Sequence, residues 1–252
     1  LAFFDYVLKE AGDQFDVFDL RLYLSPYLIA PRVDYIRERM RANGYEKPIF
    51  AGEYGGPGFF EFPENLQYLP LMSLWSVTTD EHGRPSVSPK IKQEIAKLYD
   101  KMPSLAPQTQ MFMQGCPPEL ESKYLRIQSR TLVMQNVCAL AAGVKRSLYW
   151  TYSPATNERD DIMGLMFSKF SLSQGTGKET KFTITADAFQ RMTTALAGVE
   201  SVKQVTLPEH PSVFLYAVDR GSRGTAFVVW EMRDLFTGED APAVECSWES
   251  NW

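Results

Sequence analysis

The stretch KPIFAGEYGGPG, residues 47–58, is a short apolar run that ends on a single carboxylate, Glu53, followed by glycines. Glycines let the backbone turn sharply and let a ligand approach it closely. A carboxylate held at such a turn suits a nucleophile or a general base. The same pattern also fits a surface-loop residue or the buried partner of an arginine, and the spacing alone leaves these interpretations open.

The composition limits the classes of function to which this carboxylate can belong. The chain has 252 residues, 44% hydrophobic and 23% charged, which is ordinary for a globular protein with a sizeable core. Its net charge is -5 and its pI is near 5.2, and Lys and Arg do not cluster. We therefore expect neutral or small partners, and neither nucleic acid nor a membrane surface.

The chain offers few residues for a metal site or a disulfide. Cys116, Cys138 and Cys246 lie far apart without CxxC spacing, and there are two histidines. We therefore expect no metal, no other cofactor and at most one disulfide. No stretch approaches the roughly 18 to 20 apolar residues that cross a bilayer, and the first residues lack the order of a signal peptide.

The residues before Glu53 predict alternating helices and strands. LAFFDYVLKEAG has apolar residues at helical spacing and a closing Gly12. QFDVFDLRLYL predicts a strand ending near Tyr23, and APRVDYIRERMRANG predicts a helix that stops at Gly44. KPIFAGEY then predicts a short strand of the type that a parallel sheet buries on both faces.

The residues after Glu53 are less regular. PENLQYLPLMSLWSVTTDEHGRPS and the charged helical segment PKIKQEIAKLYDKM indicate an insertion. ESKYLRIQSRTLVMQNVCALAAG, closed by Gly143, predicts a long helix that leads into the strand VKRSLYWTY, and TADAFQRMTTALAG predicts a further helix. SVFLYAVDRGSRGTAFVVWEMRD predicts a hairpin across residues 221–224, in a β-rich part that begins near residue 201.

This order of elements predicts an α/β fold with a parallel sheet, either a (β/α)8 barrel or a doubly wound sheet. Three predicted strands cannot close a barrel. In both architectures the ligand site lies at the carboxyl ends of the strands. Tyr23, Glu53 and Trp150 stand at such ends, so the sequence predicts a ligand site there.

Several motifs together resemble one family of enzymes. KPIFAGEYGGPG resembles the seventh strand of the retaining glycoside hydrolases built on (β/α)8 barrels, the clan of cellulase-like and β-xylosidase-like enzymes, where that strand ends on the nucleophilic glutamate. DVFDLRLY, with Asp16 and Tyr23, is similar to the preceding strand, which often reads Asp, apolar residues and His-x-Tyr. SLYW ends on Trp150 as the eighth strand usually ends on tryptophan, and DIMGLM and AFQRMTTALAG are similar to the segments that follow.

The resemblance covers most of residues 1–232 and implies a domain organisation. Residues 1–200 would form the C-terminal part of a TIM-barrel catalytic domain, from its fifth helix through its eighth strand, with an insertion at about residues 59–121. Residues 201–252 would begin a β-sandwich. The first five barrel strands have no counterpart, so we expect these residues to be the C-terminal part of a longer polypeptide.

The resemblance also implies a mechanism with two carboxyl groups, which in retaining glycosidases lie about 5 to 5.5 Å apart. It makes Glu53 the nucleophile. In the clan the proton donor is a glutamate after asparagine on the fourth strand, which has no counterpart here. The pair Asn157-Glu158 follows the eighth strand, and we assign it to a loop. We therefore expect the acid/base carboxylate to come from a part of the protein outside these residues.

Arg21 and Tyr23 are the charged and polar residues expected beside Glu53. Arg21 stands where the clan usually has histidine; its permanent charge would hold the carboxylate ionised, and it would also suit an acidic sugar such as a uronate. An ordinary ion pair with Asp19 or Glu53 explains Arg21 equally well. The resemblance implies that the Tyr23 phenol donates a hydrogen bond to Glu53, and core packing is the alternative for this tyrosine.

Aromatic residues are the remaining candidates for substrate contacts. Trp150 could form the flat floor on which the apolar face of a sugar stacks. Tyr54 is a further candidate, and it could line the same mouth with the aromatic group Phe59, Phe60 and Phe62, although packing is the more common reason for such clusters. His82, in the insertion, fits a solvated turn better than the site.

We therefore expect a glycoside hydrolase that cleaves a glycosidic bond with retention, through a glycosyl-enzyme on Glu53, and takes a carbohydrate as its substrate. The alternative is a non-catalytic carbohydrate-binding or scaffold protein with a degenerate barrel, which Arg21 and the absent acid/base favour. A complete α/β domain with another small-molecule site would leave a three-stranded parallel sheet with open edges. The function class alone favours an extracellular or periplasmic location, and the motifs do not specify the sugar or the linkage.

Overall fold

The computed structural model describes residues 2–23, 25–74, 77–79, 85–153, 162–175, 179–243, 245 and 247. The chain divides into two compact units. Unit 1 comprises Leu1–Tyr54, Arg130–Tyr149 and Ala188–Trp252, and unit 2 comprises Gly55–Ser129 and Trp150–Asp187.

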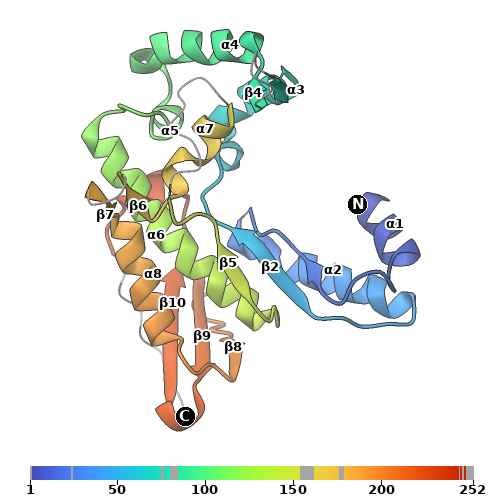
Figure 1. Ribbon diagram of the computed structural model, residues 1–252. Helices are drawn as coiled ribbons and strands as arrows, with labels where there is room; N and C mark the ends of the chain where they lie inside the picture. The colour runs from blue at the N-terminus through green and yellow to red at the C-terminus, as the bar shows by residue number, and fades with distance from the viewer. Residues whose placement is uncertain are drawn as a thin grey trace. The chain divides into compact units, whose positions relative to one another are not determined.

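Helices and strands alternate in the first part of the chain, and the last strands form an antiparallel sheet (Figure 1). The helices of the described residues are α1 (Ala2–Glu10), α2 (Ile29–Ala42), α3 (Leu69–Leu74), α4 (Pro89–Asp100), α5 (Pro107–Gln110), α6 (Pro118–Ala141), α7 (Ile162–Phe167) and α8 (Ile184–Ala195). The strands are β1 (Phe18–Asp19), β2 (Ile49–Tyr54), β3 (Val77–Thr79), β4 (Pro85–Val87), β5 (Ser147–Tyr149), β6 (Ser173–Gln174), β7 (Lys181–Phe182), β8 (Ser201–Val205), β9 (Val213–Asp219) and β10 (Thr225–Glu231).

The strands expected around Glu53 form a parallel sheet in unit 1, in the order β1-β2-β5. The strand predicted to end near Tyr23 is shorter than expected, because only two residues form the regular strand β1. Its backbone nevertheless stays bonded to β2, because the amide of Leu20 donates to Phe50 and that of Leu22 donates to Glu53. Parallel pairing of the three strands is therefore confirmed, while the complete barrel stays a prediction.

The helix α2 packs on this sheet through residues spaced along one face. Ile29, Val33, Ile36 and Met40 are all buried, and this 3.6-residue periodicity is what makes the segment helical. The helix ends before Gly44, whose φ of 82° suits a residue without a β-carbon. The predicted stop at this glycine is confirmed.

The predicted hairpin is the β9-β10 pair, to which β8 adds an antiparallel edge. Tyr216 and Val218 of β9 are buried in the same hydrophobic core as Phe18 of β1 and Val33 of α2. The parallel and antiparallel sheets of unit 1 thus share one core.

Unit 2 has an aromatic core of its own. Phe112 makes edge-to-face contacts with Phe59, Phe62 and Tyr124, at centroid distances of 5.1, 5.6 and 5.1 Å. The buried Asn65 accepts a hydrogen bond from the Thr109 hydroxyl at 2.5 Å and donates to the carbonyl of Phe59 at 2.9 Å. These contacts join the two ends of the segment predicted as an insertion.

No helix among the described residues is long and apolar enough to cross a membrane.

Candidate active site

Glu53 lies at the carboxyl end of β2, where the strand carries an extra residue. Ala51 pairs with Ser147 and Tyr54 pairs with Tyr149, so three steps along β2 match two along β5. β2 also carries this extra residue relative to the chain after β1. The amides of Leu20 and Leu22, two residues apart, bond to the carbonyls of Phe50 and Glu53, three residues apart. Such a bulge changes the direction in which side chains point, and bulges are common beside active sites.

Tyr23 donates a hydrogen bond from its hydroxyl to Oε2 of Glu53, at 2.7 Å. The expected contact between these two side chains is therefore present. Burial raises the pKa of Tyr23, and the hydrogen bond to Glu53 raises this pKa further. The phenol consequently stays protonated, and remains a donor, well above neutral pH.

Arg21 approaches the other oxygen of the same carboxylate. Its Nη2 lies 3.2 Å from Oε1 of Glu53, and its Nε lies 3.8 Å from Oδ2 of Asp19. Both ion pairs considered for Arg21 are thus present. The Arg21 side chain is 60% exposed and that of Glu53 is 28% exposed, so the carboxylate is the more enclosed group.

Asp19 and Gly52 complete the arrangement, and the sequence motifs did not single out this contact. The amide of Gly52 donates to Oδ1 of Asp19 at 2.7 Å. A β-carbon at residue 52 would lie 2.7 Å from the same oxygen, so glycine is what permits the close approach. No pattern in the sequence signals this contact, because it depends on how the Asp19 side chain folds back onto the backbone of β2.

The structure places Tyr54 in the core. The side chain is 1% exposed, and its ring makes an edge-to-face contact with Tyr149 at 5.3 Å. Burial raises the pKa of Tyr54 to about 12, while hydrogen bonds with Asn136 and Ser147 lower it. These contacts are those of a packing residue beneath the carboxyl end of the sheet.

Trp150 directly follows β5 and belongs to unit 2, where its ring contacts aromatic residues. It meets Phe167 at 5.0 Å and Phe170 at 6.5 Å, both nearly edge to face. The ring is half-buried. Its proposed role as the floor of a sugar site stays a prediction.

The glycine-rich loop after Glu53 also belongs to unit 2. Phe59 and Phe62 are buried in the aromatic core of that unit, and Phe60 packs on Phe59 at 5.1 Å. The structure therefore gives these three rings a packing role. His82 and the pair Asn157-Glu158 lie outside the described residues.

The part of the chain that the structure describes contains no group of three or more His, Cys, Asp and Glu side chains placed to hold a metal ion. Cys116 and Cys138 are free thiols, and burial raises the pKa of each.

Comparison with protein-family models, with curated proteins and with solved structures finds no match to this chain. The glycoside hydrolase resemblance therefore stays a prediction from the motifs.

The geometry around Glu53 has a definite chemical meaning. One carboxylate oxygen accepts a hydrogen bond from a neutral phenol and the other forms an ion pair with a guanidinium, so the group is oriented and its negative charge is balanced. A carboxylate fixed in this way can attack an electrophilic carbon or accept a proton.

Proposed function

We propose that Glu53 is the nucleophile of a retaining glycoside hydrolase. The observation that carries the proposal is the 2.7 Å hydrogen bond from Tyr23 to a glutamate at the bulged carboxyl end of a parallel strand. This is the contact and the place that the motif resemblance implies for the catalytic glutamate. The sheet, the strand order and the neighbouring Arg21 are compatible with the same role.

The reaction would proceed by two displacements. A carboxylate oxygen of Glu53 bonds to the anomeric carbon while the glycosidic oxygen leaves and takes a proton from a general acid. Water then attacks the same carbon, the general base removes its proton, and Glu53 leaves as a carboxylate. Two inversions give net retention of configuration.

The chain's own residues contribute orientation and charge to these steps. The Tyr23 hydroxyl fixes one oxygen of Glu53, and the Arg21 guanidinium lies beside the other oxygen and pairs with its negative charge. We propose that the acid/base carboxylate comes from a part of the protein outside these residues. The substrate is a carbohydrate whose identity depends on loops beyond Glu53.

A carbohydrate-binding or scaffold protein without catalysis is the second candidate. The observation that favours it is that Arg21 already neutralises the charge of Glu53 at 3.2 Å. An ion pair of this kind can be purely structural.

The test uses the full-length protein and a panel of 2,4-dinitrophenyl glycosides, whose leaving group needs little help from a general acid. Glu53→Gln should lower turnover by about 10³-fold or more, because the amide cannot form the glycosyl-enzyme. Glu53→Ala with added azide should regain turnover and give a glycosyl azide of inverted configuration, since azide replaces the missing nucleophile.

Glu46→Gln is the matched control, because Glu46 lies before the other end of β2 and pairs with Arg41 on the surface. It should leave turnover unchanged. The second candidate would be favoured if the native protein turns over no glycoside of the panel and Glu53→Gln still binds sugar. If Glu53→Gln turns over the glycosides as fast as the native protein does, Glu53 is not the nucleophile.

A further inference from the structure

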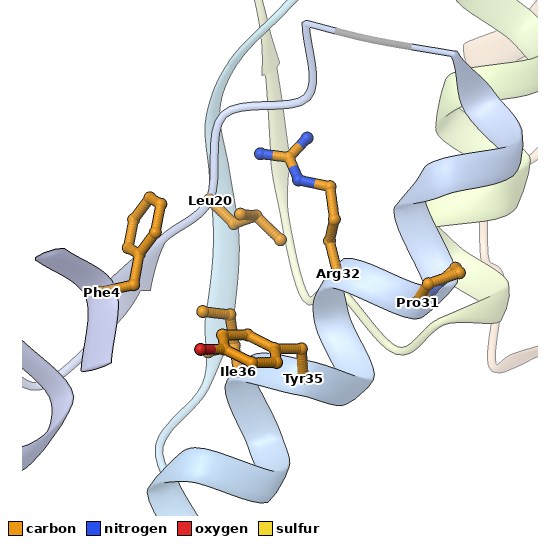
Figure 2. A pocket seen from close by; sticks show the side chains of 6 residues that line it. All are labelled: Phe4, Leu20, Pro31, Arg32, Tyr35 and Ile36. Carbon is orange, nitrogen blue, oxygen red and sulfur yellow. The ribbon is translucent and has the colours of Figure 1, made fainter. Parts of the chain in front are cut away.

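Two of the cavities in the structure differ in the chemistry of their walls. The smaller one, of about 230 Å³, belongs to unit 1. Figure 2 shows the six residues that line it: Phe4, Leu20, Pro31, Arg32, Tyr35 and Ile36. Its described walls contain no thiol, amine or carboxylate. The larger one, in unit 2, has all three of these groups.

The cavity in unit 2 has a volume of about 550 Å³ and lies at the start of α6. Cys116 comes just before this helix, Glu121 belongs to its first turn, and Lys169 lies in the short 3-10 segment Ser168–Phe170 after α7. Small residues form much of the remaining wall: Gly115, Ser168, Ser171 and Gly175. A cavity of this size holds several water molecules, so hydrogen peroxide, which is little larger than water, can enter it.

The Lys169 ammonium group contacts the Cys116 thiol in this wall. Its Nζ donates to Sγ of Cys116 at 3.2 Å and also pairs with Glu121. The thiol in turn donates to Oε2 of Glu121 at 3.3 Å. The Lys169 side chain is 9% exposed, so its amine has little freedom to move away from the sulfur.

Further contacts of Lys169 fix this arrangement. Its Nζ donates to the carbonyl of Met111 at 2.8 Å and lies 5.8 Å from the ring centre of Tyr124. The Gln128 side chain donates from Nε2 to the Lys169 carbonyl at 3.0 Å. All of these residues belong to unit 2, so the contact between Cys116 and Lys169 needs no other part of the polypeptide.

The neighbours of Cys116 give its thiol a route to the reactive thiolate. Burial raises the pKa of Cys116, and the charge of Lys169 opposes this shift. The thiol is therefore protonated at neutral pH and must lose its proton before it reacts. Glu121 already accepts a hydrogen bond from the thiol and can take this proton, while the Lys169 ammonium stabilises the thiolate.

We propose that hydrogen peroxide joins Cys116 to Lys169 through a covalent sulfur–nitrogen bond. In the first step the thiolate attacks one oxygen of the peroxide, so that a sulfur–oxygen bond forms and the oxygen–oxygen bond breaks. The leaving hydroxide takes the proton from Glu121 and departs as water. Cys116 becomes a sulfenic acid, with the sulfur oxidised and the peroxide reduced by two electrons.

In the second step Lys169 gives one proton to Glu121, and its neutral amine attacks the sulfur of the sulfenic acid. The sulfur–nitrogen bond forms and the sulfur–oxygen bond breaks. The hydroxide takes the proton from Glu121 and leaves as water, and the linked nitrogen releases one proton to the solvent. Sulfenic acids condense with backbone nitrogens in the same way, and here the side-chain nitrogen lies 3.2 Å from the sulfur.

The link has a consequence for stability. It closes a long loop of the chain between Cys116 and Lys169, and a covalent link of this kind restricts the unfolded state. The oxidised protein should therefore unfold at a higher temperature than the reduced protein. This site is separate from the proposed chemistry at Glu53, and its test does not depend on glycoside turnover.

The test treats the full-length protein with millimolar hydrogen peroxide, digests it with chymotrypsin without reductant, and identifies linked peptides by mass spectrometry. The peptides that contain Cys116 and Lys169 should appear as one species, lighter than their sum by two hydrogen atoms. Dithiothreitol should separate them, and it should also reverse the rise in unfolding temperature.

Lys169→Arg is the decisive variant, because its guanidinium keeps the charge and does not lose a proton to become a nucleophile. It should lose the linked species, and dimedone should label its Cys116 more strongly, since the sulfenic acid persists. Cys116→Ser should lose both signals. Lys97→Arg, at an exposed lysine that pairs with Glu94, is the matched control and should keep the link. Thermal unfolding establishes that each variant folds.

A linked species that persists in Lys169→Arg, or none in the native protein after peroxide treatment, would overturn the proposal. So would a disulfide from Cys116 to Cys138 or Cys246, which the identity of the linked peptides distinguishes. A species that joins Cys116 to Lys169 but retains one oxygen atom would overturn the condensation step and assign a bridge through oxygen instead.

Discussion

At the scale of single residues, Glu53 contacts two side chains of different character. The Tyr23 phenol is neutral and half-buried, whereas the Arg21 guanidinium is charged and largely exposed. The exposed Arg21 side chain can be displaced more readily than the half-buried Tyr23 phenol. We therefore expect Tyr23 to contribute more than Arg21 to the orientation of the carboxylate.

Under the proposed mechanism, Tyr23→Phe should lower kcat of the full-length protein by about 10- to 100-fold, because a hydrogen bond to a charged group contributes about 1.5 to 3 kcal/mol. The measurement is turnover of an activated aryl glycoside. Tyr45→Phe is the control, since the Tyr45 hydroxyl donates to the carbonyl of Leu8 at 2.6 Å and not to Glu53. Equal turnover by Tyr23→Phe and the native enzyme would contradict an orienting role for the phenol.

The family resemblance predicts the hydrogen bond of Tyr23 to Glu53, and the charge of Arg21 predicts an ion pair with Asp19 or Glu53. Neither predicts the contact of Arg32 with the Arg21 carbonyl, or that of Asp19 with the Gly52 amide. Both depend on how side chains fold back onto the backbone, and no periodic pattern encodes this.

At the scale of elements, the glycine-rich loop after β2 is restricted by its close contacts. A β-carbon on Gly55 would lie 2.8 Å from the Trp150 carbonyl and 2.9 Å from the Phe170 ring. One on Gly58 would lie 3.3 Å from a carboxylate oxygen of Glu61, which can move aside. The first of these glycines is therefore a packing requirement and the second is not.

Gly55→Ala should lower the free energy of unfolding by about 1 to 3 kcal/mol, as overpacking does. Gly58→Ala should lower it by less than about 1 kcal/mol, because its neighbour is flexible. Urea unfolding of both variants, followed by tryptophan fluorescence, provides the comparison. If both variants lose the same free energy of unfolding, the contact with the Trp150 carbonyl does not explain why residue 55 is a glycine.

The helices and strands around Glu53 were predictable to the extent that their patterns are local. The long helix α6 and the hairpin strands β9 and β10 follow from apolar periodicity and turn residues, and both are present. The bulge in β2 was not predictable, because it arises from pairing with two other strands. Among the described residues the parallel sheet has three strands, so the barrel remains a prediction.

At the scale of the whole molecule, each unit contains an acid whose pKa is raised by its surroundings, and the two respond to different ranges of pH. In unit 1, burial raises the pKa of Tyr54 to about 12, above its ordinary value of 10.0. This group favours the folded state fully below about pH 10, and its contribution is lost as the pH rises towards 12. In unit 2, burial raises the pKa of Glu61 to about 7, although a hydrogen bond from the Gly58 amide opposes the shift.

Glu61 gives the sharper prediction, since its range lies within ordinary working conditions. Its carboxyl group has an ordinary pKa of 4.5 in the unfolded chain and a raised one when folded, so the folded state binds the proton more tightly. Its contribution to stability is full below about pH 4.5 and is lost as the pH rises through 7. Glu61→Gln stays neutral and keeps an oxygen that can accept from Gly58, so it should be more stable than the native protein at pH 7.

The measurement is native-state hydrogen exchange of the α4 amides, in unit 2, at pH 4.5, 5.5 and 7 after correction for the intrinsic exchange rate. The native chain should lose protection across this range, and Glu61→Gln should lose less. Glu119→Gln, an exposed change at the start of α6, should follow the native profile. If Glu61→Gln and the native chain lose protection in parallel, the carboxyl group is already ionised in the folded state and the contribution assigned to its burial is absent.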